Sequence, residues 1–194
     1  MSVRALTVSL LLTVSVALAA QAPSGSKSTA PESFRANGQI TGVAGGAATE
    51  MVFKIDKYTA DAEHDALAKT LKDGGNAAFL AALKKAPKVG AITIGQRTID
   101  IRWARTRPEG TDHRRVAFVT DQPVFFAGAG AVDAKPTAGY DLAVVEFTID
   151  SVGLGSGTMA PAAKVKAGGP TGVEVDDYSG KRVTLMTVTR SMAK

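Results

Sequence analysis

Apolar and polar residues alternate between Thr49 and Tyr58. The apolar residues that would share one face are Met51, Phe53 and Ile55. Lys54 and Asp56 would lie on the other face. Because successive side chains of a strand point to opposite faces, this period of two predicts a half-buried strand. Phe34 to Thr41, just before a glycine-rich connection at Gly42 to Gly46, is predicted to be another strand.

The period becomes helical between Thr59 and Ala86. The residues that recur at helical spacing are His64, Leu67, Ala68 and Leu71, then Phe79, Leu80 and Leu83. Gly74 and Gly75 interrupt the pattern, and Pro87 follows it. Thr59 and Asn76 are the expected N-terminal caps. The pattern predicts two short helices that pack as an αα-hairpin at about 60–86.

Strand and turn patterns fill the chain from Val89 onward. The expected strands are Thr98 to Thr106, Asp112 to Thr120, Val124 to Phe126, Asp141 to Ile149, Leu154 to Lys166, Val173 to Asp177 and Lys181 to Arg190. Between them, 127–139 is rich in Gly and Ala and has no period. We expect an α+β fold, with a mostly antiparallel curved sheet or barrel of about 8–9 strands and one αα-hairpin insertion. A sandwich is the alternative.

Two hairpin registers follow from the rule that a slip of one residue turns every side chain over. Ile99, Ile101 and Trp103 are expected on one face, with Ile101 opposite Phe118, Trp103 opposite Val116 and Arg105 opposite Arg114. In the last hairpin the expected pairs are Val175 with Val183, Val173 with Leu185, Asp176 with Arg182 and Asp177 with Lys181.

The first twenty residues are typical of an export signal. A short basic start with Arg4 precedes the apolar run Ala5 to Ala20, and Ala17 to Ala19 has the small-x-small pattern of a cleavage site. We predict a signal peptide at 1–20, a flexible lead-in at 21–32 and a single antiparallel β domain at 33–194. The protein is then periplasmic or secreted, with no membrane span after cleavage. An uncleaved anchor is the alternative.

Charge and cysteine content narrow the function further. The net charge of +5 is a weak basic bias, without the basic run and interleaved aromatics of a nucleic-acid-binding surface. With no cysteine, the chain has no disulfide, thiol nucleophile or zinc–thiolate site, and no cysteine to carry a lipid anchor.

Several stretches resemble a family of exported bacterial proteins of unknown function. They are VTDQPVFF at 119–126, YDLAVVEFTID at 140–150, GSGTM and AAKV within 155–165, VEVDDY with VTLMTV within 173–188, and the helical TADAEHDALAKTLKDGG. The resemblance covers most of the chain after the signal and implies one exported domain without an assigned catalytic residue. The loop that is aromatic and charged in that family is Gly/Ala-rich here, at 127–138.

Candidate catalytic and metal-binding motifs are weak. Asp61, His64 and Asp65, with Glu63 beside them, share a helical face that could contribute metal ligands, but helix capping explains the same acids. The glycines of 153–157 precede a predicted strand rather than the helix of a phosphate loop, so we assign them to a turn and bulge. Paired carboxylates that converge only in the fold would make the protein a periplasmic hydrolase.

A basic hairpin is the most distinctive chemical feature. Arg102, Arg105, Arg107, Arg114 and Arg115 surround Trp103 and His113. Arginine forks suit carboxylates and phosphates, so Trp103, Arg105, Arg107 and Arg114 are the candidate ligand-binding residues. Local ion pairs with Glu109 or Asp112 are the alternative.

We therefore expect an exported non-enzymatic domain that uses no cofactor or metal and does not bind nucleic acid. It would bind a small or amphipathic anionic ligand, or a protein partner at the cell envelope. A purely structural or interaction module and the hydrolase are the alternatives.

Overall fold

The computed structural model describes residues 30–40, 48–126 and 136–192. The elements are β1 (Glu32–Ile40), β2 (Thr49–Ile55), α1 (Asp61–Leu83), β3 (Gly90–Ile94), β4 (Arg97–Glu109), β5 (His113–Thr120), β6 (Leu142–Asp150), β7 (Leu154–Ala167), β8 (Val173–Tyr178) and β9 (Val183–Met192). The predicted signal peptide, most of the lead-in, the connection at 42–46 and most of the stretch at 127–139 lie outside the described residues.

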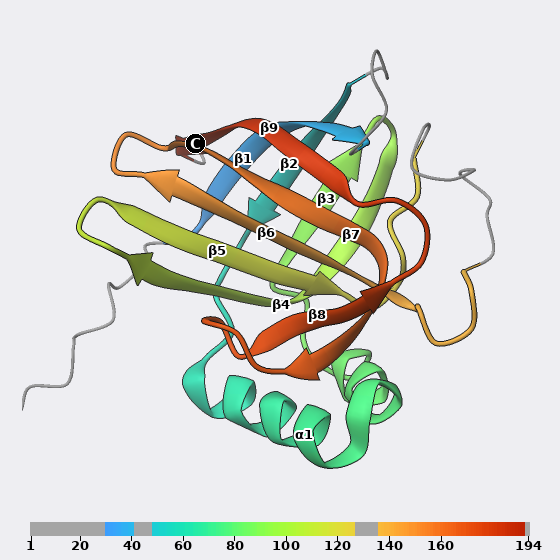
Figure 1. Ribbon diagram of the computed structural model, residues 1–194. Coiled ribbons are helices and arrows are strands. Elements are labelled where there is room, and N and C mark those ends of the chain that lie inside the picture. The colour runs from blue at the N-terminus through green and yellow to red at the C-terminus, as the bar shows by residue number, and fades with distance from the viewer. Residues whose placement is uncertain (1–29, 41–47, 127–135, 193–194) are drawn as a thin grey trace, which may run out of the picture.

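Eight strands close into an antiparallel barrel (Figure 1). The sheet order is β6-β5-β4-β3-β2-β1-β9-β7, and the pairing of β6 with β7 joins its ends. β8 is the ninth strand and pairs with the second half of β7, outside the ring. This confirms the predicted antiparallel barrel and its number of strands, and the sandwich alternative is wrong.

Aromatic side chains fill the barrel interior. Phe34, Phe53, Phe118 and Phe147 come from four different strands, and each is at most 1% exposed. Their ring centroids lie 4.9 to 6.1 Å apart in tilted, edge and stacked arrangements. The predicted alternation in β2 is confirmed, because Met51 and Ile55 point inward with Phe53. The interior is therefore a packed core at this level.

A turn and a close strand contact explain two of the glycines in the motif at 153–157. Gly153 has a φ of 90° in the turn before β7. A Cβ at Gly157 would lie 2.2 Å from the backbone oxygen of Glu146 in β6. The register of β7 against β9 also shifts between Gly155 and Gly157. The assignment of these glycines to a turn and bulge is confirmed.

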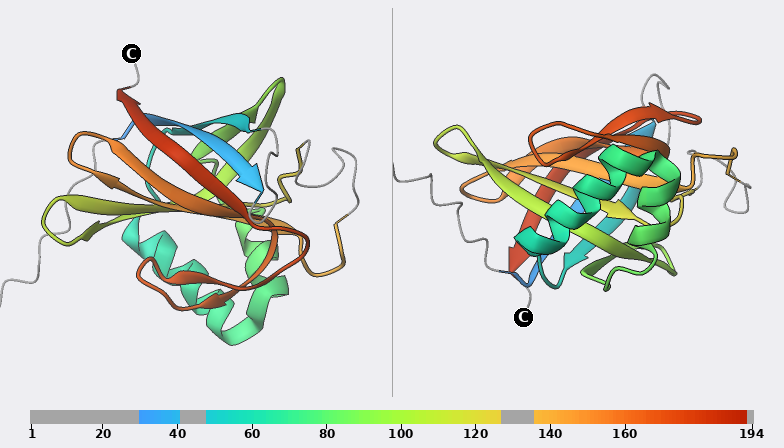
Figure 2. Two further views of the ribbon diagram at one scale, coloured as in Figure 1. Left: turned by 45° about the horizontal axis from the view of Figure 1, so that its top comes forward. Right: turned by 90° about the horizontal axis from the view of Figure 1, so that it is seen from below.

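The helical region is one kinked helix, α1, rather than two helices that pack against each other. Gly75 has a φ of 68° and a ψ of −168°, which breaks the helical geometry and turns the chain (Figure 2). Both helical segments lie against the outer wall of the barrel (Figure 2). Asn76 does not act as a simple cap. Its amide donates to the Gly139 carbonyl and accepts from the N–H of Val165, so it ties the kink to β7.

A second core lies between α1 and the barrel wall. The helix contributes the buried residues Leu67, Leu71, Phe79 and Leu83, as predicted. Strands β4 to β8 contribute Trp103, Ala117, Val119, Leu142, Val144, Ala160, Ala163, Val165 and Val173. The predicted cap at Thr59 is wrong, since Ala60 precedes the helix and the Thr59 hydroxyl accepts from the N–H of Ala104 in β4 at 3.0 Å.

The predicted register of the β4–β5 hairpin is wrong. Trp103 pairs with Val119 rather than Val116, and Arg105 pairs with Ala117 rather than Arg114. One cause is a β-bulge between Ile101 and Trp103, which leaves Ile101 inside the barrel and turns Trp103 outward. The other cause is that β4 continues to Glu109, which shortens the loop.

The predicted pairing of the last two strands is also wrong. Val183 and Leu185 lie inside the barrel because β9 is hydrogen-bonded to β1 on one side and β7 on the other. With both edges of β9 occupied, β8 pairs with β7 instead. Asp176 then forms an ion pair with Lys166 rather than Arg182.

Two smaller findings complete the fold. The segment Val124 to Phe126 is not a strand, although the N–H of Val124 donates to the Pro161 carbonyl at 2.9 Å. Within the described ranges, no helix has the length and apolar character needed to cross a membrane.

Candidate functional site

The four predicted ligand-binding residues do not form one site. Trp103, Arg105 and Arg107 lie on the outer face of β4, where α1 begins, whereas Arg114 points into one end of the barrel. The expected contact between Arg105 and Arg114 is therefore absent, because they lie on opposite sides of the sheet. Arg107 is exposed beside Arg105.

Trp103 is part of the core under α1. It is fully buried, and its indole N–H donates to Nδ1 of His64 at 3.3 Å. His64 is 7% exposed, and a Cβ at the neighbouring Gly172 would lie 2.5 Å from its ring. Burial lowers the pKa of His64, and the positive charge of Arg105 lowers it further. These two rings therefore hold α1 against the barrel and are not available to a ligand.

Arg105 binds the start of α1. Its guanidinium donates to the Asp61 carboxylate at 2.6 Å and to the Thr59 carbonyl at 3.2 Å. The hydrogen bond from Arg105 and its charge hold the pKa of Asp61 below its usual value. Two of the candidate metal ligands are also engaged elsewhere: Asp61 binds Arg105, and His64 is buried. No group of acids and histidines among the described residues could hold a metal ion.

Arg114 is neutralised at the end of the barrel. The two terminal nitrogens of its guanidinium donate to the two carboxylate oxygens of Glu32, and the distance from Nη1 to Oε1 is 2.9 Å. Glu32 is 3% exposed. Tyr58 also contacts Glu32, and the guanidinium lies 5.7 Å from the centre of the Phe34 ring. The local ion-pair alternative holds for Arg114, but the acid is Glu32 rather than Glu109 or Asp112.

Arg115 connects the outer ends of β4, β5 and β6. It binds Glu109 and also Glu146, the latter at 2.8 Å. Hydrogen bonds from Arg115 and from the Thr148 hydroxyl hold the pKa of Glu109 below its usual value. These contacts fix both carboxylates along the outer wall.

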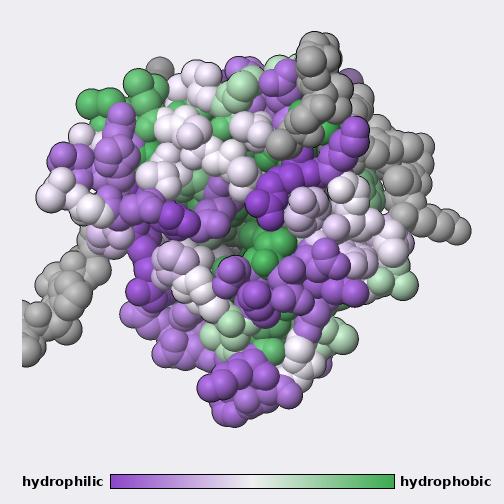
Figure 3. Space-filling view, viewed as in Figure 1, coloured by the Kyte–Doolittle hydropathy of each residue, from purple (hydrophilic) through white to green (hydrophobic). Residues whose placement is uncertain are grey.

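A groove on the outer wall of the barrel is the best candidate site. We call it the β8 groove; it is lined by Val144, Glu146, Thr158, Ala160, Glu174, Val175 and Arg182, and its volume is about 190 Å³. Val144 and Ala160 form an apolar floor, and the charged residues stand around it. In Figure 3 a hollow with hydrophobic residues at its base lies in the middle of this face, among hydrophilic residues.

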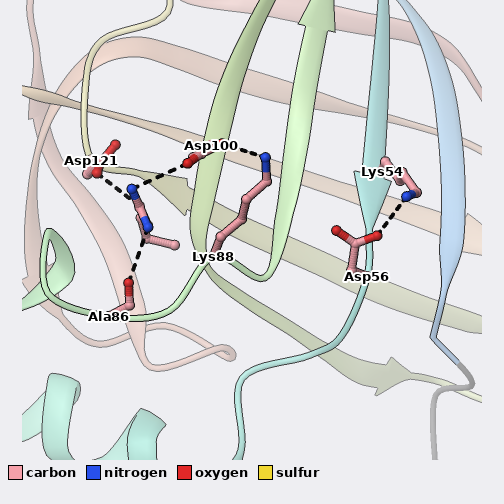
Figure 4. A network of polar contacts seen from close by, with 7 residues as sticks. Lys54, Asp56, Ala86, Lys88, Asp100 and Asp121 are labelled. Atoms are coloured by element: carbon pink, nitrogen blue, oxygen red, sulfur yellow. Dashed lines mark hydrogen bonds and ion pairs between the residues drawn. The ribbon is translucent and has the colours of Figure 1, made fainter.

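A second hollow, of about 470 Å³, is more polar and lies around Arg102. Arg102 pairs with Asp121 at 3.0 Å and with Asp100 at 3.3 Å, and it also donates to the Ala86 carbonyl (Figure 4). Asp100 in turn pairs with Lys88 at 2.7 Å (Figure 4). These charged groups pair with one another, so the network has a structural role: it links β4 to the loops after α1 and β5.

Comparison of the chain with protein-family models, with curated proteins and with solved structures finds no match. The resemblance to exported bacterial proteins therefore stays a prediction.

The basic-hairpin hypothesis missed the β8 groove, because four separate elements form it. Its floor residues are small and apolar, and in the sequence they look like any core position of β6 and β7. The one signal was the run Val173 to Asp177, which alternates apolar and acidic residues. The same alternation also fits one half of a hairpin with the following strand, which is the pairing that the sequence predicts.

Proposed function

We propose that the protein is an exported, non-enzymatic binding module that takes a segment of an envelope protein partner in the β8 groove. The observation that carries this proposal is the phenylalanine cluster at the centre of the barrel. A barrel that holds a ligand inside needs an open lumen, and here four buried rings occupy it. The outer wall is then the surface that remains for recognition.

The charges at the barrel end support the same conclusion. An anionic ligand at that end would have to compete with Glu32 for Arg114, and Glu32 is already buried there with two-pronged geometry. Separating a buried carboxylate from its arginine is costly, because a charge without its partner is then left away from water. The β8 groove has an apolar floor and charged residues around it, and a ligand can bind there without separating Glu32 from Arg114.

A small amphipathic anion is the second candidate for the same groove. Arg182 would meet its charged end, while Val144, Ala160 and Val175 would contact its apolar part. The hydrolase alternative has less support. Glu109 and Glu146 share Arg115, which lowers the pKa of Glu109, whereas an acid catalyst needs a raised one.

Native mass spectrometry of protein isolated from its own cells tests the proposal. Thr158 lines the β8 groove, and Thr93 lines a separate outer hollow with Thr49, Glu50 and Val52, so Thr158→Arg and Thr93→Arg are a matched pair. We expect a bound polypeptide with the native protein and with Thr93→Arg, but not with Thr158→Arg. A bound small molecule with the same pattern would favour the second candidate, and equal binding by both variants would contradict the site.

A further inference from the structure

β8 is an edge strand that borders the groove. It is the last strand in the sheet order, and β7 is its one strand neighbour among the described residues. Glu174 and Val175 of β8 line the β8 groove opposite Val144 and Ala160 of the barrel wall. Figure 1 shows β8 in front of β4 and β5. Four of its side chains are exposed: Glu174, Asp176, Asp177 and Tyr178. An edge strand offers unpaired backbone donors and acceptors to another extended chain.

The charge pattern of β8 indicates which kind of chain fits. Its acidic residues are Glu174, Asp176 and Asp177. The strand that already pairs with it, β7, places Lys166 opposite Glu174 and Lys164 opposite Asp177. Lys166 also lies 3.5 Å from the carboxylate of Asp176. Opposite charges across neighbouring strands stabilise pairing, and like charges oppose it.

The apolar residues of the two strands match in the same way. Val175 pairs with Val165, and Val173 pairs with Ala167, on the face that looks toward the second core. A strand that complements β8 therefore alternates basic residues with small apolar ones, as β7 does. A groove of about 190 Å³ with Val144 and Ala160 at its floor has room for such small side chains.

We infer that β8 accepts an extended, basic segment of a partner protein as an added strand along the β8 groove. This rests on the proposed function and names its partner class: a chain in which Lys or Arg alternates with small apolar residues. Backbone hydrogen bonds give such complexes their affinity, and the alternate side chains give them specificity. A second copy of β8 does not fit, because its acids would face the same acids.

A synthetic peptide with the sequence of β7 is the probe for this inference. Residues 160–168, APAAKVKAG, already contain a complement to β8, so the fluorescein-labelled peptide can be titrated into the whole protein by fluorescence anisotropy. We expect saturable binding that weakens as salt is added. Glu174→Lys should weaken it about fivefold or more, because an attractive cross-strand pair becomes a repulsive one. Glu50→Lys, an exposed acid on β2, should leave it unchanged.

Two modified peptides separate strand addition from simple charge attraction. A peptide with both lysines replaced by glutamate should not bind. A peptide with alternate backbone amides methylated keeps every charge but loses hydrogen-bond donors, so it should also fail to bind. Equal binding of the methylated peptide, or equal loss in Glu174→Lys and Glu50→Lys, would overturn the inference.

The proposed function can fail separately. If the β7 peptide does not bind, but the native protein still carries a partner that Thr158→Arg loses, strand addition is wrong and the groove proposal stands. If neither the peptide nor a native partner binds, both are wrong. Self-association that rises with concentration and disappears in Thr158→Arg would identify a second copy as the occupant of the β8 groove and would also overturn the inference.

Discussion

At the scale of single residues, the β-bulge at Arg102 determines which face of the sheet each later residue of β4 occupies. Arg102 lies between Ile101 inside the barrel and Trp103 outside it. A bulge adds one residue to one strand, and therefore reverses the face of every residue that follows. Arg105 consequently meets Asp61 at the start of α1, and Arg114 meets Glu32 in the barrel. The two arginines, expected opposite each other, therefore lie on different sides of the sheet.

The buried contact between His64 and Trp103 makes stability depend on pH. Burial and the charge of Arg105 lower the pKa of His64 in the folded protein, whereas a histidine in the unfolded chain has a pKa of about 6.5. Below that pH the unfolded chain binds more protons than the folded one. The free energy of unfolding should therefore be constant just above about pH 6.5 and fall as the pH decreases below it.

Urea denaturation between pH 5 and 8, followed by the fluorescence of Trp103, measures this dependence directly, since the chain has one tryptophan. His64→Gln should remove most of the slope between pH 5 and 6.5. His113→Gln, at the exposed histidine, should retain it. A slope that survives in His64→Gln and disappears in His113→Gln would contradict the assignment.

At the scale of elements, α1 is attached by its apolar side to the barrel wall and held at its kink by Asn76. Leu67, Leu71, Phe79 and Leu83 pack against Trp103, Ala160 and neighbouring residues of β4 to β8. Asn76 satisfies a carbonyl at 139 and the N–H of Val165 at the point where Gly75 breaks the helix. The helix thus supports β7 and β8, the two strands that shape the β8 groove.

Leu71→Ala measures how firmly the helix is attached. Leu71 is 3% exposed in the second core, so removal of its side chain should lower the free energy of unfolding by about 2–5 kcal/mol. Lys72→Ala, at the exposed neighbouring position, should change it by less than about 0.5 kcal/mol. Urea denaturation of both variants checks this. A cost below about 1 kcal/mol for Leu71→Ala would mean that the helix contributes little to the folded state.

At the scale of the whole molecule, hydrophobic periodicity predicted the helical region and most of the strands, but it missed β3 and gave a strand at Val124 to Phe126 that the structure lacks. The alternation of Met51, Phe53 and Ile55 and the helical stripe through Leu67 and Leu71 each predicted the buried side correctly. These features depend on local spacing alone. The number of antiparallel strands predicted a curved sheet or barrel, with a sandwich as the alternative, and the structure shows the barrel.

The candidate site was not predictable to the same degree, because it depends on register and on distant partners. A bulge at Arg102 has no local signature, and it moved Trp103 from the barrel interior to the core under α1. Likewise, the segments that contain Val173 and Val183 both alternate apolar and polar residues, as the two strands of a hairpin would. Closure of the barrel decides otherwise, because β9 pairs with both β1 and β7 and leaves β8 outside. The β8 groove forms because β8 pairs with β7 outside the closed barrel.

Photo-crosslinking in the cells of origin tests most directly whether recognition takes place on the outer wall at β8. A photoreactive phenylalanine analogue placed at Thr158 would lie in the β8 groove, and the same group at Thr93 would lie in the separate outer hollow beside β2. We expect irradiation to give a discrete higher-mass adduct from position 158 and none from position 93. An adduct from position 93 alone, or none from either position, would contradict the account.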